Sequence, residues 1–246
     1  MGYYELIEFF GVNIVKSEKN KILQALVKTI ESGKKERITT MNAQIAYYLL
    51  YRKGFKEIVN DSLIIPDGIG LSWAMKRLKN EKIERYPGVE LVFDICKLSR
   101  KNGYKVFLLG AKQGVAKKAA ENLSKSTDVE IAGYMHGYFE KNEENNERIC
   151  EQIKKSSADI LFVGLGAPYQ EEWLKKYFDK TGVKIGIGVG GSIDIYAGEA
   201  KRAPKLIQDA NLEWLYRILQ NPKKKFKVIF QIIRFMFKVF SEKYSN

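Results

Sequence analysis

ILFVGLGAPYQEEW, residues Ile160–Trp173, is the stretch that decides the fold, because an apolar strand runs through a glycine turn into a helix that opens with Pro168. Such junctions in α/β proteins bind phosphate, since backbone N–H groups and the positive end of the helix both point at the ligand. A second glycine-rich junction, GIGVGGSID, follows at Gly186–Asp194. We therefore expect two glycine-lined strand ends to face one crevice that holds a phosphorylated ligand.

Short apolar runs and amphipathic stretches alternate along the rest of the chain. The apolar runs predict strands at Arg37–Thr40, Ser62–Ile65, Lys105–Leu109, Val129–Gly133, Asp159–Val163 and Lys184–Gly188. The amphipathic stretches predict helices near Glu18–Ser32, Ala43–Arg52, Ile69–Lys79, Val89–Asn102, Val115–Lys125, Glu144–Lys155 and Tyr169–Asp179. This alternation is typical of an α/β fold with a mainly parallel, Rossmann-like sheet and helices on both faces.

Composition favours one large core. The chain has 246 residues, of which 45% are hydrophobic, and no linker is visible before the last fifty residues. We expect a catalytic α/β domain at residues 1–196 and an appendage at 197–246. The two cysteines, Cys96 and Cys150, lack the spacing of metal ligands, which argues against a zinc site or a disulfide framework and favours a reducing compartment. We expect neither a secretory signal nor a transmembrane helix, and hence a cytoplasmic protein.

The appendage is strongly basic and amphipathic. Net charge is +13, and residues 197–246 carry eleven Lys/Arg against four Asp/Glu. Between Lys223 and Phe240 a stripe of Lys224, Lys227, Gln231, Arg234 and Lys238 adjoins a wide face of Phe226, Ile229, Phe230, Ile233, Phe235, Phe237 and Phe240. This pattern predicts a helix lying on an anionic membrane, whereas nucleic acid would not need so wide an apolar face. The alternative is a terminal helix that packs on the body or on a partner chain, and an apolar tail left free in water also predicts a homo-oligomer.

Polar side chains follow several predicted strands at their carboxyl ends: Thr40 and Asn42, Asp67, His136 to Tyr138, Gln170 and Asp194. Each taken alone is adequately explained as a helix cap or a turn residue. Caps would, however, be spread over both edges of the sheet. Their clustering at one edge indicates a binding site there.

Seven sequence blocks, in order along the chain, are those of a known family: Thr40–Ala43, Ile65–Gly68, Arg85–Gly88, Phe107–Ala111, Gly164–Trp173, Gly188–Asp194, and Arg202–Pro204 with Leu212–Arg217. In these blocks the chain resembles the WecG/TagA/CpsF glycosyltransferases. The resemblance implies transfer of an N-acetylated mannosamine or related sugar from a UDP donor to a polyprenyl-diphosphate-linked sugar, on the inner face of the cell membrane. The pattern is most similar to members that join N-acetylmannosamine in β-1,4 linkage to undecaprenyl-diphosphate-linked N-acetylglucosamine in teichoic acid synthesis. A UDP-sugar transferase of another surface polysaccharide is the alternative.

The resemblance also suggests roles for individual residues. Asp67 would face the sugar site as the base for the acceptor hydroxyl, and Arg85 would bind the departing diphosphate. Thr40, Asn42 and Gln170 would orient the donor. The nucleotide would be framed by Gly110, Gly137, Tyr138, Gly164, Gly166, Gly190, Gly191 and Asp194. The lipid diphosphate would be met by Arg217, Lys224 and Lys227, of which the two lysines stand where arginine is expected.

No metal or other cofactor is expected, because the sequence has no Asp-x-Asp triplet. The sequence offers one candidate base and no evident pair of nucleophiles. This favours a single displacement with inversion at the anomeric carbon.

Two other classes of protein share part of this pattern. Gly186–Gly191 matches GxGxxG, which suggests a nicotinamide-dependent oxidoreductase, but only about fifty residues follow it and they offer no second nucleotide-binding half. A non-catalytic membrane or nucleic-acid binding module rests on the basic appendage alone.

Overall fold

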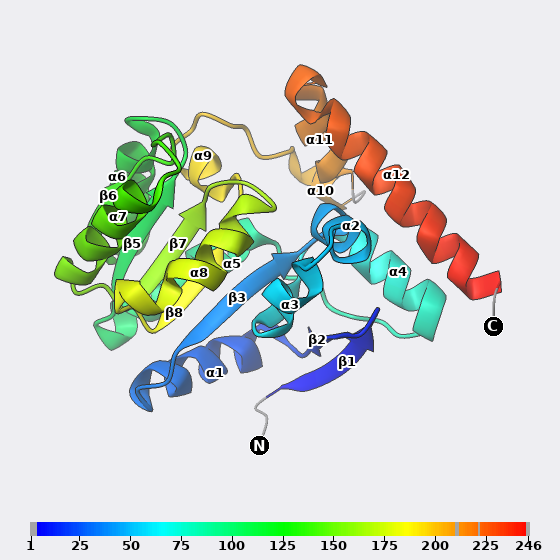
Figure 1. Ribbon diagram of the computed structural model, residues 1–246, viewed down its shortest axis with the longest axis horizontal. Helices are drawn as coiled ribbons and strands as arrows, with labels where there is room; N and C mark the ends of the chain where they lie inside the picture. Colours follow the sequence, from blue (N-terminus) through cyan, green and yellow to red (C-terminus); the bar gives the residue numbers. More distant parts are fainter. Residues whose placement is uncertain (1–3, 210–211, 221, 245–246) are drawn as a thin grey trace.

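The protein, seen here in a computed structural model that describes residues 4–209, 212–220 and 222–244, is built around a twisted sheet (Figure 1). Its described part contains an eight-stranded sheet of order β1-β2-β4-β3-β8-β7-β5-β6, in which only the β1–β2 pair is antiparallel. The strands are β1 (Glu5–Phe9), β2 (Val12–Lys16), β3 (Glu36–Met41), β4 (Leu63–Pro66), β5 (Lys105–Gly110), β6 (Glu130–Met135), β7 (Ile160–Gly164) and β8 (Ile185–Gly188). The expected mainly parallel α/β sheet is confirmed.

Helices cover both faces of this sheet. Helices α1 (Lys19–Glu31), α5 (Gly88–Asn102), α6 (Val115–Thr127) and α9 (Ser192–Tyr196) share one buried cluster with the strands. The other face carries α2 (Ala43–Tyr51), α3 (Phe55–Asn60), α4 (Ile69–Lys79), α7 (Glu143–Lys155) and α8 (Tyr169–Thr181). All six predicted strands and all seven predicted helices are present, with ends within a few residues of those expected.

The hairpin β1–β2 was not predicted. Phe9 pairs with Val12, so the loop is the two residues Phe10 and Gly11, whose φ angles are 47° and 76°. Two-residue hairpin loops with positive φ at both positions usually have the sequence Asn-Gly or Asp-Gly. Phenylalanine at the first position gives no such signal, because a bulky residue rarely adopts positive φ.

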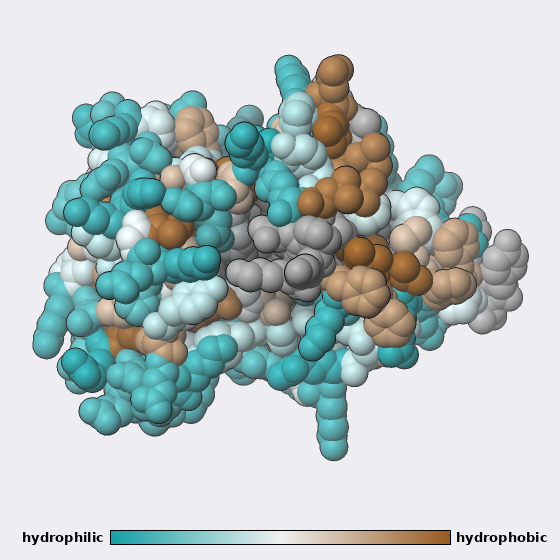
Figure 2. All heavy atoms as spheres, turned by 90° about the horizontal axis from the view of Figure 1, so that it is seen from above, coloured by the Kyte–Doolittle hydropathy of each residue, from teal (hydrophilic) through white to brown (hydrophobic). Residues whose placement is uncertain are grey.

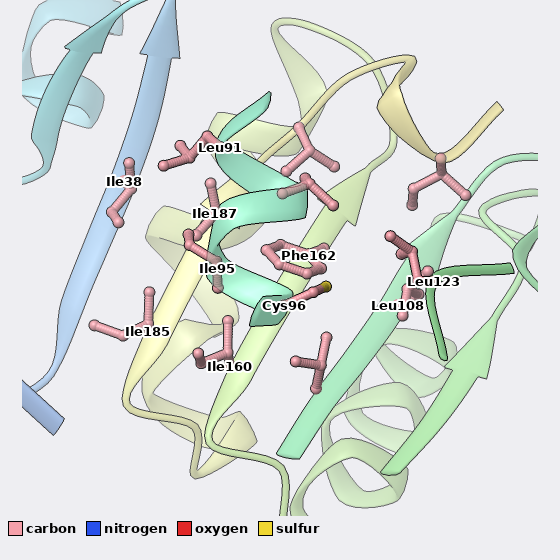
Figure 3. Packing of buried hydrophobic residues seen from close by; sticks show 14 of the residues in the cluster. Ile38, Leu91, Ile95, Cys96, Leu108, Leu123, Ile160, Phe162, Ile185 and Ile187 are labelled. Carbon is pink, nitrogen blue, oxygen red and sulfur yellow. The ribbon is translucent and has the colours of Figure 1, made fainter. Parts of the chain in front are cut away.

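Strand residues alternate between the two layers of the core. Ile160 and Phe162 point toward α5, together with residues from the neighbouring strands (Figure 3). Leu161 and Val163 pack on the opposite layer, beneath α7 and α8. Strands that are buried on both faces must be apolar at every position, which is why they read as continuous apolar runs. Both cysteines are buried and free.

Two glycines of the GxGxxG match serve close packing of α8 on β8. A Cβ atom on Gly186 would lie 2.8 Å from Cδ2 of Phe178, and one on Gly188 would lie 2.9 Å from Nε2 of Gln170. Side chains at these positions would therefore push α8 off the sheet. The glycine spacing is explained by this contact and gives no support to a dinucleotide-binding fingerprint.

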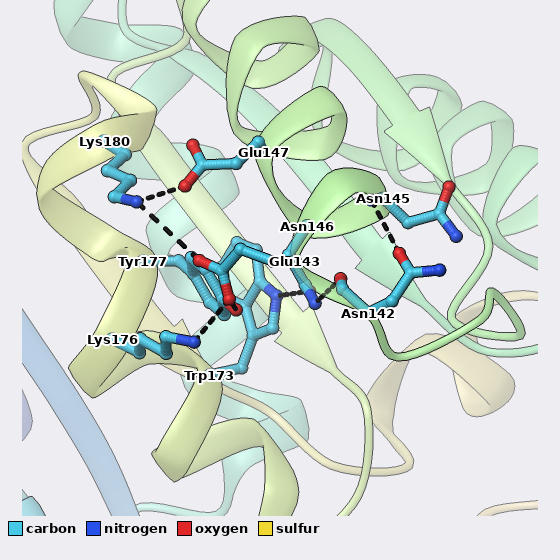
Figure 4. Close-up of polar contacts among 9 residues, drawn as sticks. All are labelled: Asn142, Glu143, Asn145, Asn146, Glu147, Trp173, Lys176, Tyr177 and Lys180. Atoms are coloured by element: carbon cyan, nitrogen blue, oxygen red, sulfur yellow. Dashed lines mark hydrogen bonds and ion pairs between the residues drawn. The ribbon is translucent and has the colours of Figure 1, made fainter.

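Helix α8 is held in place by polar contacts with α7 (Figure 4). The buried indole Nε1 of Trp173 donates to Oδ1 of Asn146 over 2.7 Å, and the hydroxyl of Tyr177 donates to Glu143 over 2.9 Å. Asn142 caps α7 by accepting from the N–H of Asn145. A buried indole needs such an acceptor, so the bond fixes the rotation of α8 about its axis.

The C-terminal appendage forms α10 (Lys205–Asp209), α11 (Glu213–Gln220) and α12 (Pro222–Tyr244), and α12 packs on α2 and α4. Phe235 and Val239 are fully buried in the cluster that contains Phe9 and Met41. The expectation that Phe235 belongs to a membrane face is therefore wrong. The predicted alternative, packing on the body, holds for this side of α12.

The opposite side of α12 faces solvent. Phe226, Phe230 and Phe237 are 73%, 59% and 71% exposed. Apolar residues, brown in Figure 2, gather on the right of the molecule, where Figure 1 places α11 and α12, while the left is mainly hydrophilic. Within the described residues, we find no helix whose length and hydropathy would let it cross a bilayer.

Two phenylalanines two positions apart test how α12 is docked. Phe235→Ala should lower the free energy of unfolding by about 3–5 kcal/mol, because it leaves a cavity against α2 and α4. Phe237→Ala deletes a ring that is exposed to solvent, so the free energy of unfolding should change by less than about 0.5 kcal/mol. Denaturant titration measures both, and equal effects would contradict this packing.

Candidate active site

A pocket of about 450 Å³ opens at the carboxyl ends of β3, β4 and β8. Strands β3 and β8 are neighbours, yet the chain leaves β3 for α2 on one face of the sheet and leaves β8 for α9 on the other. Divergent connections of this kind leave a crevice between adjacent strands, which is where open α/β sheets bind ligands. The pocket therefore lies where the topology predicts a ligand site.

Four helices of nine or more residues begin at the edge of this pocket, and the shorter α9 and α11 begin there too. Lining residues include the first residues, or those just before them, of α2, α4, α5 and α8: Asn42 and Ala43, Gly68 and Ile69, Pro87 and Gly88, and Ala167. The N-terminus of a helix carries about half a positive charge and presents N–H groups that lack partners within the helix. Their convergence makes the pocket suited to an anion such as a diphosphate.

Three oxygen-bearing side chains surround one point at the start of α5. A Cβ placed on Gly88 would lie 3.5 Å from Oγ of Ser192, 3.7 Å from Oδ2 of Asp67 and 3.7 Å from Oγ1 of Thr40. Glycine at position 88 thus keeps open the space between them. Thr40 donates its hydroxyl proton to the carbonyl of Gly188 over 2.7 Å, which ties β3 to β8 under the pocket.

Backbone bonds fix the loops that carry Asp67 and Arg85. The N–H of Asp67 donates to Met41 O and the N–H of Tyr86 donates to Pro66 O, each over 2.7 Å. Asp67 is thereby held beside the end of β3, with the Arg85 loop next to it. Arg85 is half-buried, and its Nη2 donates to Gln208 O of α10 over 3.4 Å. The expected base and the expected phosphate ligand line the same pocket.

Asn42 and Gln170 also line the pocket, and both have structural bonds. Oδ1 of Asn42 accepts from the N–H groups of Gln44 and Ile45, so Asn42 is the helix cap that the simpler interpretation predicts. Its side-chain nitrogen is the atom left to meet a ligand. Oε1 of Gln170 accepts from the N–H of Gly190 over 3.1 Å, which anchors the turn after β8 to the start of α8.

The predicted glycines form a continuous row from the pocket along the sheet edge. Gly166, Gly190 and Gly191 line the pocket. A Cβ on Gly164 would approach Gly190 O to 2.8 Å, one on Gly110 would approach Gly164 O to 2.5 Å, and one on Gly137 would approach the Gly110 Cα to 3.1 Å. Glycine is required at these positions by close contact of backbones. The row brings the carboxyl ends of β8, β7, β5 and β6 together.

The remaining predicted site residues lie outside the pocket lining. Tyr138 is 68% exposed beyond β6, past the far end of the glycine row. Asp194 lies in α9, with Oδ2 3.8 Å from a Cβ placed on Gly191. Lys227 is exposed on α12. The side chains of Arg217 and Lys224 lie outside the described residues, so their predicted roles stay predictions.

The apolar wall of the pocket was not predicted. It is formed by Trp73, Trp214, Val228, Ile232, Phe235 and Met236. Four of these come from α12; of the four, Phe235 had been assigned to a membrane face, and Val228, Ile232 and Met236 had been given no role. Assigning them to a pocket needs the docking of α12 on α2 and α4, which sequence periodicity does not reveal.

Glu171 was also missed. It is 3% exposed, its Oε1 accepts from Nε2 of Gln170 over 2.7 Å, and its Oε2 has no hydrogen-bond partner among the described residues. Burial raises the pKa of the Glu171 carboxyl to about 7. Glutamates in the first turn of a helix are usually exposed, so the sequence offers no sign that this one is buried.

Within the described residues, no group of three or more His, Cys, Asp or Glu side chains is arranged to hold a metal ion. The charge of a bound anion would be met by helix N-termini and Arg85.

Comparison with known proteins agrees with this geometry. Two curated relatives from Staphylococcus aureus, strains MW2 and MRSA252, are each named N-acetylglucosaminyldiphosphoundecaprenol N-acetyl-beta-D-mannosaminyltransferase. Each is 36% identical to this chain over 188 residues, which span 76% of this chain and 73% of the relative. The match to the family extends over residues 7–246. This chain therefore belongs to the glycosyl transferase WecG/TagA/CpsF family.

Proposed function

We propose that this protein transfers N-acetylmannosamine from UDP-N-acetylmannosamine to undecaprenyl-diphosphate-linked N-acetylglucosamine, forming a β-1,4 linkage in the linkage unit of wall teichoic acid. The names of the curated relatives support this acceptor and this sugar. One observation of the structure supports it most strongly: four helix N-termini and Arg85 converge on a pocket that also holds Asp67. A sugar nucleotide needs both features, because its diphosphate departs while an acceptor hydroxyl loses a proton.

The reaction follows as a single displacement. The acceptor oxygen forms a bond to the anomeric carbon of the donor while the bond from that carbon to the UDP oxygen breaks. The hydroxyl proton passes to the carboxylate of Asp67, and UDP leaves with the bonding electrons. The N-termini of α2, α4, α5 and α8, together with Arg85, stabilise the charge that develops on the diphosphate. Attack opposite the leaving group inverts the anomeric carbon.

The two kinds of wall in the pocket fit the two ends of the acceptor. Asp67 and Thr40 are polar lining residues that would meet the acceptor sugar, and the apolar lining residues of α4 and α12 would meet the lipid part. That wall continues into the solvent-exposed phenylalanines of α12, which would lie among lipid headgroups. On this proposal the protein is peripheral on the inner membrane face, where lysines on α12 attract anionic lipid.

UDP release from a panel of UDP-sugars, with a short-chain lipid-diphosphate-linked N-acetylglucosamine as acceptor, tests the function. UDP-N-acetylmannosamine should be the preferred donor, and its turnover should persist in excess EDTA, because helix N-termini and Arg85 supply the positive charge. Preference for another UDP-sugar would assign the enzyme to a different surface polysaccharide. Loss of turnover in EDTA, with recovery on adding Mg²⁺ or Mn²⁺, would contradict the metal-independent mechanism.

Asp67→Asn serves as the matched variant in this assay. It keeps the shape of the side chain and removes its ability to accept a proton, so turnover should fall about 10²-fold or more while UDP affinity changes little. Turnover near that of the wild type would move the base to another residue, of which Asp194 is the first candidate.

Membrane binding is tested on the exposed side of α12. Replacing Phe226, Phe230 and Phe237 together by serine should weaken binding to anionic liposomes at least about tenfold, because their burial among lipids is lost. Salt should weaken wild-type binding only in part, since screening leaves the apolar contribution. Leu6→Ser combined with Tyr134→Ser, exposed apolar residues on β1 and β6, is the control.

Equal liposome binding by the triple variant and the wild type would show that α12 is not the membrane anchor. Substitution is preferable to deleting the residues after Gly198, because deletion would also remove Phe235 and Val239 from the core.

A further inference from the structure

Glu171 does not line the pocket, but it is hydrogen-bonded to Gln170, which does. It is 3% exposed, as is Gln170, the residue between it and the pocket. Both side chains lie over Gly188, since a Cβ there would be 2.9 Å from Nε2 of Gln170 and 3.1 Å from Oε1 of Glu171. The sheet thus leaves a space at Gly188 that the pair fills.

Only one orientation of the Gln170 amide satisfies both of its hydrogen bonds, one with Gly190 and one with Glu171. The N–H of Gly190 can only donate, so Gln170 must turn its Oε1 toward Gly190. Nε2 of Gln170 then points to Glu171 and needs an acceptor, which Oε1 of Glu171 provides at 2.7 Å. A hydrogen-bond donor in place of Glu171 would favour the opposite orientation of the Gln170 amide. The Nε2 group of Gln170 would then face the N–H of Gly190, and two donors would oppose each other.

We propose that Glu171 is a positioning residue, which fixes the amide orientation of Gln170 and, through it, the Gly190 turn at the edge of the pocket. This inference rests on the proposed function only in taking that edge to be part of the sugar-nucleotide site. Glu171 itself touches no substrate.

The protonation state of Glu171 decides whether the Gln170 amide has a single orientation. Burial is the main cause that raises the pKa of its carboxyl to about 7, and the neighbouring charge of Glu172 contributes in the same direction. Within the described part of the chain, Glu172 is the one neighbouring charge that acts on it, and Arg52 at the end of α2 pairs with Glu172. The strands beneath present Gly188 and Thr40, which do not titrate.

The direction of the effect follows from the bonds. Above neutral pH the carboxylate only accepts, so Gln170 has one orientation and the Gly190 N–H keeps its partner. Below neutral pH the carboxyl gains a proton that it can donate to Gln170, and the amide can then reverse. We therefore expect the Gly190 turn to be ordered above about pH 7 and to lose its anchor as the pH falls.

The amide resonance of Gly190 reports this directly. Val–Gly pairs occur only at Val163–Gly164 and Val189–Gly190 in the sequence, so ¹³C-carbonyl valine with ¹⁵N-glycine labelling selects these two resonances. In the ligand-free wild type, the Gly190 resonance should shift with a midpoint near pH 7. Glu171→Gln should abolish this titration, whereas Glu172→Gln, which removes the same charge one residue away, should keep it. A Gly190 resonance that does not titrate in the wild type, or titrates equally in Glu171→Gln, would overturn the proposal.

The KM for the donor gives a second, independent test of the positioning role. At pH 8, Glu171→Leu, which cannot accept, and Glu171→Gln, which can donate as the protonated carboxyl does, should each raise the KM for the donor, by about tenfold for the leucine variant, while Glu172→Gln should keep the wild-type value. Equal KM values for the leucine variant and the wild type would count against positioning. If the Gly190 amide resonance shifts with pH as expected but no UDP-sugar is turned over, the proposed function fails and the positioning role stands.

Discussion

The arrangement of the site depends on helix N-termini being held together at one edge of the sheet. Helices α2, α4 and α8 approach from one face and α5 from the other, and each begins beside the pocket. Bringing like partial charges together is unfavourable in itself, so packing must hold them there. Gly186 and Gly188 let α8 lie close to β8, and the bond from Trp173 to Asn146 fixes how α8 is turned. A bound diphosphate would relieve the repulsion among the helix ends.

Helix α12 joins three environments that are usually separate. Phe235 and Val239 complete the core over α2 and α4, while Val228, Ile232 and Met236 form a wall of the pocket. The remaining side exposes phenylalanines beside lysines. If that exposed side binds a bilayer, the same helix places the pocket wall at the membrane surface, where a lipid-linked acceptor would enter.

The sheet and the main helices could be predicted because their signals are local. Strands such as β7 are buried on both faces and read as unbroken apolar runs, and glycine turns mark where each ends. The pocket position followed in part, since Asn42 and Asp67 come after β3 and β4, which are neighbours in the sheet. Three features could not follow from local patterns: the hairpin turned by Phe10, the burial of Glu171, and the division of α12 into buried and exposed sides. Each depends on what the residue packs against.

We propose that the pocket between β3 and β8 receives the UDP diphosphate without a metal, and a crystal structure of the protein with UDP, grown in EDTA, would test this. We expect diphosphate density among the N-termini of α2, α4, α5 and α8, within hydrogen-bond distance of Arg85 or of the Gly190–Gly191 turn. UDP bound at another surface, or a diphosphate turned away from these helix ends, would contradict it.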